Sequence, residues 1–285
     1  MPKILVTGAN GQLGTELRKR CRNLPAFTFL FADIEEFDIC NDKSVNEYFI
    51  EHTPAYLINC AAYTAVDKAE SDKKTAHKVN SEAVKILNEA CLQHNTRMIH
   101  ISTDYVFDGK SFRPYNEEDV PHPLSVYGKS KLAGEQKLSP FNSIIIRTSW
   151  LYSAQGNNFM KTMLRLGREK GSLRVVFDQV GSPTYAGDVA DCILSILKYN
   201  QNSGFANGIY HFSNEGVCSW YDFAREIMQR ANIDCTIEPI ETKDYHTPAA
   251  RPYFSVLNKH KIKSTFGISI PHWQDGLISC FNDFN

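Results

Sequence analysis

The chain has 285 residues, of which 42% are hydrophobic and 22% are charged, and its formal net charge at pH 7 is -1. This composition is ordinary for a globular protein with one large domain, or with a large domain and a smaller lobe. The near-neutral balance of charges gives no sign of the basic face that binds nucleic acid, so a nucleic-acid partner is not expected.

The eight cysteines are scattered along the chain, without the C-x-x-C pairs that are typical of zinc sites and redox dithiols. Free thiols of this kind fit a reducing compartment. The segment from Met1 to Gly8 lacks the apolar run of a signal peptide, and no run approaches the ~20 apolar residues that a membrane helix needs. We therefore expect a cytoplasmic protein without a membrane partner.

Strand and helix patterns alternate through the first half of the chain. The apolar runs that predict strands cover residues 4–7, 27–32, 56–62, 98–102 and 143–148. Helical spacing of apolar residues follows the first strand from Leu13 to Cys21, begins near Asp42 after the second, and extends from Ala76 to Ala90 after the third. Short strands separated by helices indicate βαβ units and a parallel sheet that is covered on both faces. The predicted fold class is therefore α/β, with a Rossmann-type doubly wound sheet.

The second half of the chain is less regular. Strands are expected at 174–177 and 209–212, and helices at 188–197 and 273–284. Ser219 and Asp222 resemble a capping box at the start of a further helix. We expect a dinucleotide-binding domain at residues 1–150 and a mainly substrate-binding lobe at 151–285, some segments of which return to the sheet.

Gly8, Gly11 and Gly14 lie between the first strand and the first helix, where glycines let the backbone turn and approach a pyrophosphate closely. The free N–H groups at the start of the helix favour an anion. Asp33 ends the second strand, where a carboxylate binds the adenosine ribose 2′-OH and repels a 2′-phosphate, so the residues favour NADH over NADPH. The alternatives are a plain turn for the glycines and a helix cap or exposed loop acid for Asp33.

Tyr127 and Lys131 are spaced by one helical turn, which places both side chains on one face. A tyrosine near an ammonium and an oxidised nicotinamide ionises more readily than a free phenol, which suits a proton donor to a carbonyl oxygen that receives hydride. Thr103 follows the fourth strand, at the edge where doubly wound sheets bind ligands, and is placed to hydrogen-bond a substrate carbonyl. Considered alone, Tyr127 and Lys131 are a common pair on helix surfaces, and Thr103 can simply hydrogen-bond to nearby backbone groups. The three residues together indicate a catalytic site.

The motifs that contain these residues extend over most of the chain. They are Val6–Gly14, Asn59–Glu70, Val79–Asn80, Ser102–Gly109, Tyr127–Lys131, Arg147–Trp150 and Gly181–Thr184. This combination resembles the extended short-chain dehydrogenases and, within them, the dTDP-4-dehydrorhamnose reductases. The resemblance implies reduction, with NADPH or NADH, of the C4 keto group of a dTDP-6-deoxy-sugar, which converts dTDP-4-dehydrorhamnose to dTDP-L-rhamnose.

The resemblance also implies roles for individual residues. Those implied for the cofactor are Gly8, Gly11, Gln12, Leu13 and Gly14 around the pyrophosphate, Asp33, Asp38 and Ile39 around the adenosine, Ala62, Tyr63 and Thr64 beyond the third strand, and the helical pair Tyr127 and Lys131. Those implied for the substrate are Thr103, Asp104, Trp150 and Arg251, the last on its diphosphate. For Trp150 the alternative is ordinary core at the end of a strand, and for Arg251 it is a surface salt bridge.

Tyr105 separates this resemblance from a second one, to the nucleotide-sugar 4,6-dehydratases. Those enzymes carry Thr-Asp-Glu at the end of the corresponding strand, where the acids serve elimination, and here Tyr105 replaces the glutamate. The missing carboxylate favours simple reduction. Two alternatives stay open: another nucleotide-sugar reductase or epimerase, and a non-enzymatic cofactor-binding regulatory subunit. A subunit without catalytic activity does not need Thr103, Tyr127 and Lys131, so their presence together argues against the second alternative.

Glu16, in the first turn of the first helix, bears on metal binding and self-association. Some relatives bind Mg²⁺ at a dimer contact through the matching glutamate, so Mg²⁺ and a homodimer are left open. The alternative, which we favour, is an exposed glutamate stabilised by the helix dipole. His100, in the fourth strand, is expected to be a packed core residue that points away from the site.

Overall fold

Short apolar runs form the central sheet of this computed structural model, which describes residues 1–284. Within those residues, parallel strands pair side by side in the order β10 (Gly208–His211), β5 (Ser143–Thr148), β4 (Arg97–Thr103), β3 (Tyr56–Asn59), β1 (Lys3–Thr7) and β2 (Thr28–Ala32). The chain starts in the interior of the sheet at β1, adds β2 on one side, and then continues from β3 to the other edge. This order confirms the predicted α/β class with a doubly wound sheet.

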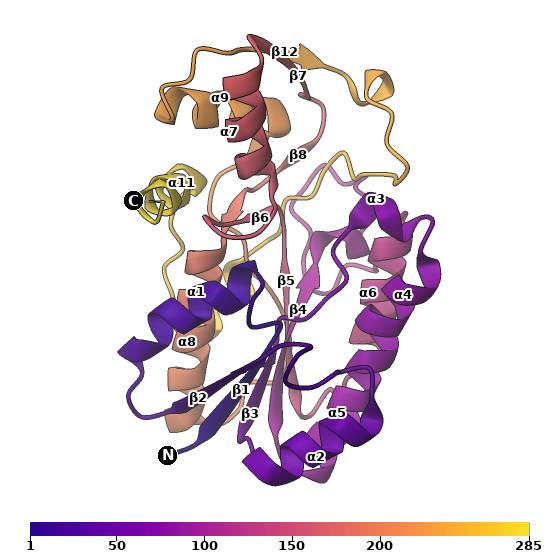
Figure 1. Cartoon of the computed structure of the whole chain (residues 1–285), viewed down its shortest axis with the longest axis vertical. Helices are drawn as coiled ribbons and strands as arrows, with labels where there is room; N and C mark the ends of the chain where they lie inside the picture. Colours follow the sequence, from indigo (N-terminus) through magenta and orange to yellow (C-terminus); the bar gives the residue numbers. More distant parts are fainter. Residues whose placement is uncertain (285) are drawn as a thin grey trace.

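Helices cover both faces of the sheet (Figure 1). On one face lie α1 (Gln12–Arg20), α8 (Ala186–Ser203) and α10 (His260–Phe266). On the other face lie α2 (Asp42–His52), α4 (Lys73–His77), α5 (Ala83–Gln93) and α6 (Val126–Glu135). Each face carries its own buried cluster of apolar side chains. Burial on both faces explains why the strands read as apolar runs rather than as alternating patterns.

Two elements differ from their predicted bounds. β3 ends at Asn59, short of residue 62, because the Asn59 side-chain oxygen accepts a hydrogen bond from the Ala61 N–H at 3.2 Å and turns the chain. The helix predicted from residue 76 to residue 90 is α4 and α5, joined by a π-helical turn, η2 (Lys78–Glu82). Such π turns often occur at functional positions, and this one carries the buried Asn80.

A smaller lobe lies beyond the carboxyl edge of the sheet (Figure 1). Its paired strands are β6 (Leu151–Tyr152) with β9 (Thr184–Tyr185), β7 (Ser172–Val176) with β12 (Thr236–Ile240), and β8 (Val180–Gly181) with β11 (Cys218–Ser219). Its helices are α7 (Phe159–Glu169), α9 (Trp220–Arg230) and α11 (Trp273–Asn282). They enclose a separate apolar cluster, and the predicted capping box of Ser219 and Asp222 starts α9. The division of the chain at residue 150 stays a proposal, with β10, α8 and α10 as the later segments that pack with the sheet.

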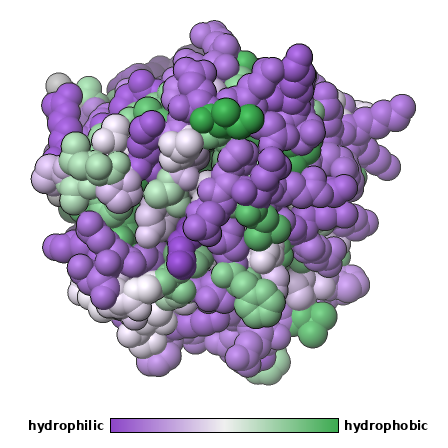
Figure 2. Space-filling view, turned by 90° about the horizontal axis from the view of Figure 1, so that it is seen from below, coloured by the Kyte–Doolittle hydropathy of each residue, from purple (hydrophilic) through white to green (hydrophobic). Residues whose placement is uncertain are grey.

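Short turns connect these elements, and the outer surface is largely polar. The turns are η1 (Cys21–Asn23), α3 (Val66–Ala69), η3 (Asp104–Val106) and η4 (Thr242–Asp244). Seen from the side opposite the smaller lobe, the surface is mostly hydrophilic, with hydrophobic residues in separated groups (Figure 2). Among the helices described, none combines the length and apolar character that would let it cross a bilayer. The cysteines are free thiols.

Helix α6 is held closely against its neighbours. The Ser125 hydroxyl caps it by accepting a hydrogen bond from a backbone N–H of the first turn. At the other end, Glu135 forms a buried ion pair with Arg147 of β5, at 2.7 Å. Gly134 lets the helix approach η2 so closely that an added Cβ would overlap the carbonyl oxygen of Asn80. The helix is therefore fixed at both ends.

Replacing Gly134 with alanine is expected to destabilise the protein, although alanine is the better helix former by about 0.5–1 kcal/mol. The overlap with the Asn80 carbonyl should outweigh that gain and cost about 1–3 kcal/mol, as is typical of overpacking. Urea unfolding measures the change. Gly171→Ala is the matched control, because nothing lies within 4 Å of the added Cβ there. A Gly134→Ala protein as stable as the wild type would contradict the close contact.

Candidate active site

Two cavities meet at the carboxyl edge of the sheet. The main cavity, of about 560 Å³, lies over the ends of β1, β4 and β5 and the start of α6. The side cavity, of about 380 Å³, lies over the ends of β1 and β2. The residues that border both are Gly8, Gly11, Cys60 and Ala62. The two cavities therefore form one trough that crosses the point where the strand order reverses, which is where doubly wound sheets bind ligands.

The glycine turn after β1 lies where the cavities meet. Gly8 has a φ of +65°, and an added Cβ would lie 2.7 Å from the backbone nitrogen of Ala61. Gly11 is the N-cap of α1, so the free N–H groups of the first helical turn begin at the cavity wall. An added Cβ at Gly14 would lie 2.6 Å from the Cα of Ala9. A narrow turn, a helix N-terminus and a two-part trough fit a dinucleotide with its pyrophosphate at the glycines.

Asp33 lies in the side cavity, and the backbone holds its carboxylate in place. Its Oδ2 accepts the Asn10 N–H at 2.9 Å, and its Oδ1 accepts the Ile34 N–H at 2.9 Å. Asp38 and Ile39 border the same cavity, as predicted for residues around an adenosine. The carboxylate of Asp33 therefore has a fixed position at the end of β2.

The other residues predicted for the cofactor occupy different places. Ala62, Thr64 and Leu13 border the main cavity. Tyr63 instead directs its hydroxyl to Asp72, 3.4 Å from Oδ2. The position of Tyr63 follows from its backbone, which is fixed by a neighbouring asparagine.

That asparagine is Asn80, whose sequence motif with Val79 did not by itself indicate this role. Its side chain accepts the Tyr63 N–H at 2.9 Å and donates to the Tyr63 carbonyl at 3.0 Å and to the Ser130 hydroxyl at 2.9 Å. It thereby ties the segment after β3 to α6. An asparagine inside an apolar helical pattern was the available signal, because a buried amide needs partners.

Gln12 connects the glycine turn to the smaller lobe. Its side-chain oxygen accepts hydrogen bonds from Asn158 Nδ2 at 2.9 Å and from the Ser153 hydroxyl at 3.3 Å. Gln12 and Asn158 both border the main cavity. The wall of this cavity is therefore built by both parts of the fold.

Tyr127 projects from α6 into the main cavity. Its ring packs edge-on against Tyr105, with 5.5 Å between the ring centroids. Burial raises the pKa of Tyr127 to about 12; the Thr103 hydroxyl opposes this shift and Asp104 adds to it. The sequence predicts a tyrosine that ionises readily, whereas in the protein alone burial dominates. The phenol keeps its proton at neutral pH, which is the form that donates a proton.

Lys131 lies one turn further along α6 and is buried. Its Nζ donates to the Ile101 carbonyl at 2.7 Å and lies 3.5 Å from Nε2 of His100. Burial lowers the pKa of Lys131 to about 8, although the nearby Glu135 and Cys60 act in the opposite direction. His100 is buried as expected, but the expectation that it points away from the site is wrong. The lysine side chain extends from α6 and meets it.

Thr103 and Asp104 lie at the carboxyl end of β4. The Thr103 hydroxyl donates to Asp104 Oδ1 at 3.0 Å and accepts the Tyr105 N–H at 3.2 Å. Asp104 is 2% exposed, and burial raises its pKa to about 7 although the hydrogen bond from Thr103 opposes the shift. Within residues 1–284, its Oδ2 has no hydrogen-bond partner. A carboxyl group with a free oxygen at a cavity wall suits a ligand hydroxyl.

Trp150 lies on the wall of the main cavity and stacks on a second tryptophan of the smaller lobe, Trp220, which borders a further cavity. Trp150 and Trp220 stack with 3.5 Å between ring centroids and 7° between ring planes. Trp150 has a φ of +49°, a conformation that is uncommon outside glycine. Arg251 also borders this further cavity, of about 290 Å³. Its guanidinium pairs with Asp67 of α3 at 2.8 Å and 3.1 Å, so in the protein alone it forms a salt bridge.

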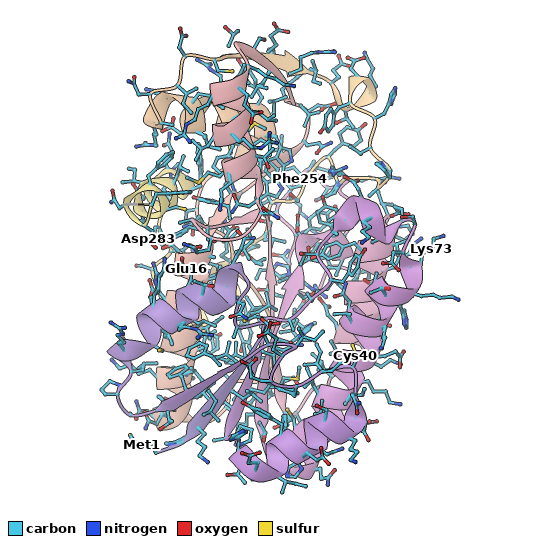
Figure 3. The ribbon with its side chains drawn as sticks, in the orientation of Figure 1. Met1, Glu16, Cys40, Lys73, Phe254 and Asp283 are labelled. Atoms are coloured by element: carbon cyan, nitrogen blue, oxygen red, sulfur yellow. The ribbon has the colours of Figure 1, made fainter. Side chains whose placement is uncertain are left out.

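The position of Glu16 differs from the prediction in two respects. It is buried, not exposed, and it lies beyond the first turn of α1, because the helix starts at Gln12. Its carboxylate pairs with Lys19 at 3.1 Å and with Arg20. Lys19 also pairs with Asp283, which follows α11, and Figure 3 shows Glu16 and Asp283 on neighbouring elements. Two cations thus already neutralise this carboxylate, and residues 1–284 hold no cluster of metal-ligating side chains. The Mg²⁺ site gains no support, and the homodimer stays a prediction.

Comparisons with known proteins agree over the whole chain. Residues 2–285 match the family described as RmlD substrate binding domain. The chain is 45% identical to the dTDP-4-dehydrorhamnose reductase of Aggregatibacter actinomycetemcomitans, with 97% of each chain covered. The crystal structure of the dTDP-4-dehydrorhamnose reductase from Clostridium acetobutylicum is 41% identical, with a TM-score of 0.93 and 98% of each chain covered. That from Bacillus anthracis, in complex with NADP, is 37% identical, with a TM-score of 0.92 and 99% and 100% covered.

Asp104→Asn is expected to stabilise the protein relative to the wild type at about pH 8 but not at about pH 4. The fold raises the pKa of Asp104 above its ordinary value of 3.8, so ionisation costs the folded state stability. The cost is absent below about pH 4, grows as the pH rises to about 7, and then reaches about 2–4 kcal/mol. Urea unfolding at both pH values measures the difference.

The control for this experiment is Asp234→Asn, which removes an exposed carboxylate between α9 and β12. Because that carboxylate is exposed, the variant measures the effect of removing one surface charge alone. If the stability difference between Asp104→Asn and the wild type were the same at both pH values, the carboxyl group of Asp104 would not be destabilised by burial.

Proposed function

This chain belongs to the family of the RmlD substrate binding domain, and from that premise we propose that it reduces the 4-keto group of dTDP-4-dehydrorhamnose to give dTDP-L-rhamnose, with NADH or NADPH as reductant. The supporting observation is that Thr103, Tyr127 and Lys131 converge at one end of a trough shaped for a dinucleotide. The product is an activated sugar for cell-surface polysaccharide. Synthesis in the cytoplasm is part of the proposal and is consistent with the free thiols.

Four residues of the main cavity have distinct tasks in this reaction. When bound, the reduced nicotinamide supplies hydride to the sugar C4. Tyr127 then donates its phenolic proton to the oxygen on that carbon, for which its raised pKa is suited. Thr103 hydrogen-bonds the same oxygen and orients the ketone. Asp104 binds a sugar hydroxyl through its free Oδ2, and Trp150 packs on the ring.

The diphosphate of the substrate would lie toward the further cavity that Arg251 borders. The guanidinium group of arginine binds phosphate oxygens in a bidentate geometry. Arg251 can therefore release Asp67, with which it forms a salt bridge, and bind the diphosphate instead. A regulatory subunit would need binding alone, whereas here a protonated phenol and a buried lysine lie in the cavity where the ketone binds. We therefore favour the enzyme over the binding subunit.

We further propose that NADH is preferred over NADPH. The side cavity places the Asp33 carboxylate at the end of β2, and two backbone N–H groups hold it there. Glu36 lies against the same turn and accepts the Asp33 N–H at 2.7 Å. The Asp33 carboxylate, fixed at the adenosine end of the trough, would repel the charge of a 2′-phosphate. A free 2′-OH instead donates a hydrogen bond to Asp33.

Tyr127→Phe is expected to lower kcat by about 10²–10⁴-fold, because the proton donor is lost, while the cofactor still binds. The assay follows the absorbance of the reduced nicotinamide, with dTDP-4-dehydrorhamnose prepared enzymatically. Tyr152→Phe is the matched control, because within residues 1–284 the Tyr152 hydroxyl is buried without a hydrogen-bond partner, and it lies in the core of the smaller lobe.

A near wild-type rate in Tyr127→Phe would remove Tyr127 from the mechanism. If the wild type itself oxidised no cofactor in the presence of this sugar but still bound the cofactor, the substrate would be a different nucleotide sugar or the protein would be a binding subunit.

Asp33→Asn is expected to raise the ratio of kcat/KM for NADPH to kcat/KM for NADH by about tenfold, which corresponds to about 1.4 kcal/mol of repulsion removed. The substitution keeps the shape of the side chain and one acceptor oxygen for the backbone. Glu35→Gln is the control, since Glu35 is exposed and its charge is screened by solvent. An unchanged ratio in Asp33→Asn would show that this carboxylate does not select the cofactor.

A further inference from the structure

A chain of polar side chains runs through the sheet beneath Lys131. The Thr7 hydroxyl of β1 donates to Asn59 Oδ1 of β3 at 2.7 Å, and Asn59 Nδ2 lies 3.1 Å from Nδ1 of His100 on β4. Nε2 of the same imidazole lies 3.5 Å from Lys131 Nζ. Thr7, Asn59, His100 and Lys131 are each at most 2% exposed. Polar groups buried in this way are costly unless their donors and acceptors match.

The orientation of the Asn59 amide is fixed by its neighbours. Its Oδ1 lies 3.2 Å from the backbone nitrogen of Ala61. A backbone N–H can only donate, so the atom that faces it is the oxygen and the other atom of the amide is the NH₂ group. That NH₂ group faces Nδ1 of His100.

The amide in turn fixes the proton of His100. An NH₂ group can only donate, so Nδ1 accepts from it and carries no hydrogen. A neutral imidazole then has its proton on Nε2, the nitrogen that faces Lys131. The doubly protonated ring would place an N–H against the Asn59 NH₂, and burial together with the charge of Lys131 already lowers the pKa of His100 well below its ordinary value.

We propose that His100 is a positioning residue for Lys131: Asn59 holds its ring with the proton on Nε2, and that N–H donates to the neutral amine of Lys131 and disfavours the ammonium. An ammonium has three donors and no acceptor, so it would meet the Nε2–H donor to donor, whereas an amine offers a lone pair. The Ile101 carbonyl accepts from Nζ in either form and holds the nitrogen in place at 2.7 Å.

The other ionisable groups around Lys131 do not reverse this preference. From α6 itself come Tyr127, which is neutral at pH 7, and Glu135, whose charge is paired with Arg147 of β5. From the segment after β3 comes Cys60, whose pKa burial raises to about 12, so its thiol is neutral as well. Burial lowers the pKa of Lys131 to about 8, and the donor that we assign to His100 acts in the same direction as burial.

This arrangement has a use in the reaction. Each turnover removes the phenolic proton of Tyr127, and that proton must be replaced before the next one. A lysine that gives up its proton easily can supply it, because the amine that remains is stabilised by the Nε2–H of His100. The lysine then regains a proton from solvent. The proposal rests on the proposed reductase function only for this use; the state of the His100–Lys131 pair can be measured without substrate.

The first test uses the wild-type protein in solution. Nitrogen-15 NMR of the histidine rings at neutral pH should show His100 as a neutral ring with its hydrogen on Nε2, assigned by comparison with His100→Gln. A ring with its hydrogen on Nδ1, or an imidazolium, would overturn the proposal whatever the activity of the enzyme.

The second test follows the titration of Lys131 by carbon-13 NMR of labelled lysine side chains, with Lys131→Met to assign the signal. His100→Gln places an amide at the position of Nε2, and its oxygen can accept from an ammonium, so the midpoint for Lys131 should rise by about one pH unit. His211→Gln is the matched control, because His211 is an equally buried strand histidine that contacts the Tyr115 carbonyl instead. An unchanged Lys131 midpoint in His100→Gln would overturn the proposal.

The third measurement is the pH profile of kcat/KM, which reports the ionisations of the free enzyme. The limb that reflects Lys131 should shift in His100→Gln by the same amount as the NMR midpoint. A uniform loss of rate without a shift would indicate a structural role and would contradict the proposal. If no sugar is reduced at all, the proposed function fails while both NMR tests still decide the inference.

Discussion

The buried ion pair between Glu135 and Arg147 is the interaction on which the site depends. Glu135 follows Tyr127 and Lys131 at intervals of one helical turn, so the three side chains share one face of α6. Arg147 of β5 fixes this face against the sheet at 2.7 Å, and both partners are buried. A buried ion pair contributes little to the net free energy of unfolding, because removing both charges from water is costly. It does restrict the helix to a single position against the sheet. Here that position sets where the phenol and the lysine enter the main cavity.

Other contacts hold the rest of the site in a fixed position relative to α6. Asn80 joins α6 to the backbone after β3, and Gly134 removes the side chain that would prevent the approach. Gln12 joins the glycine turn to the smaller lobe through Asn158. Groups that are distant in sequence therefore meet with little freedom, which is what hydride and proton transfer require of the residues around the ketone.

Much of this could be predicted because it is local. Strand ends, helical spacing and the glycine turn place Thr103, Tyr127 and Gly11 at one edge of the sheet from short-range pattern alone. The setting of Glu16 was wrong because its carboxylate lies against Tyr185, whose hydroxyl donates to Glu16 Oε2 at 3.3 Å, and a contact so distant in sequence leaves no trace in the local pattern. The contact of His100 with Lys131 was missed for the same reason. The ionisation states of buried groups depend on such long-range contacts and follow only from the folded chain.

The stacked pair of Trp150 and Trp220 has a consequence for how the protein can be observed. The chain has three tryptophans, and two of them form this stack, in which Trp150 borders the main cavity. Most of the indole absorption of the molecule therefore comes from a stack that borders the main cavity through Trp150. A ligand that enters there changes the polarity around the rings and the electronic coupling between them. The fluorescence and near-ultraviolet circular dichroism of the unlabelled protein thus act as an optical signal of occupancy, without any added dye.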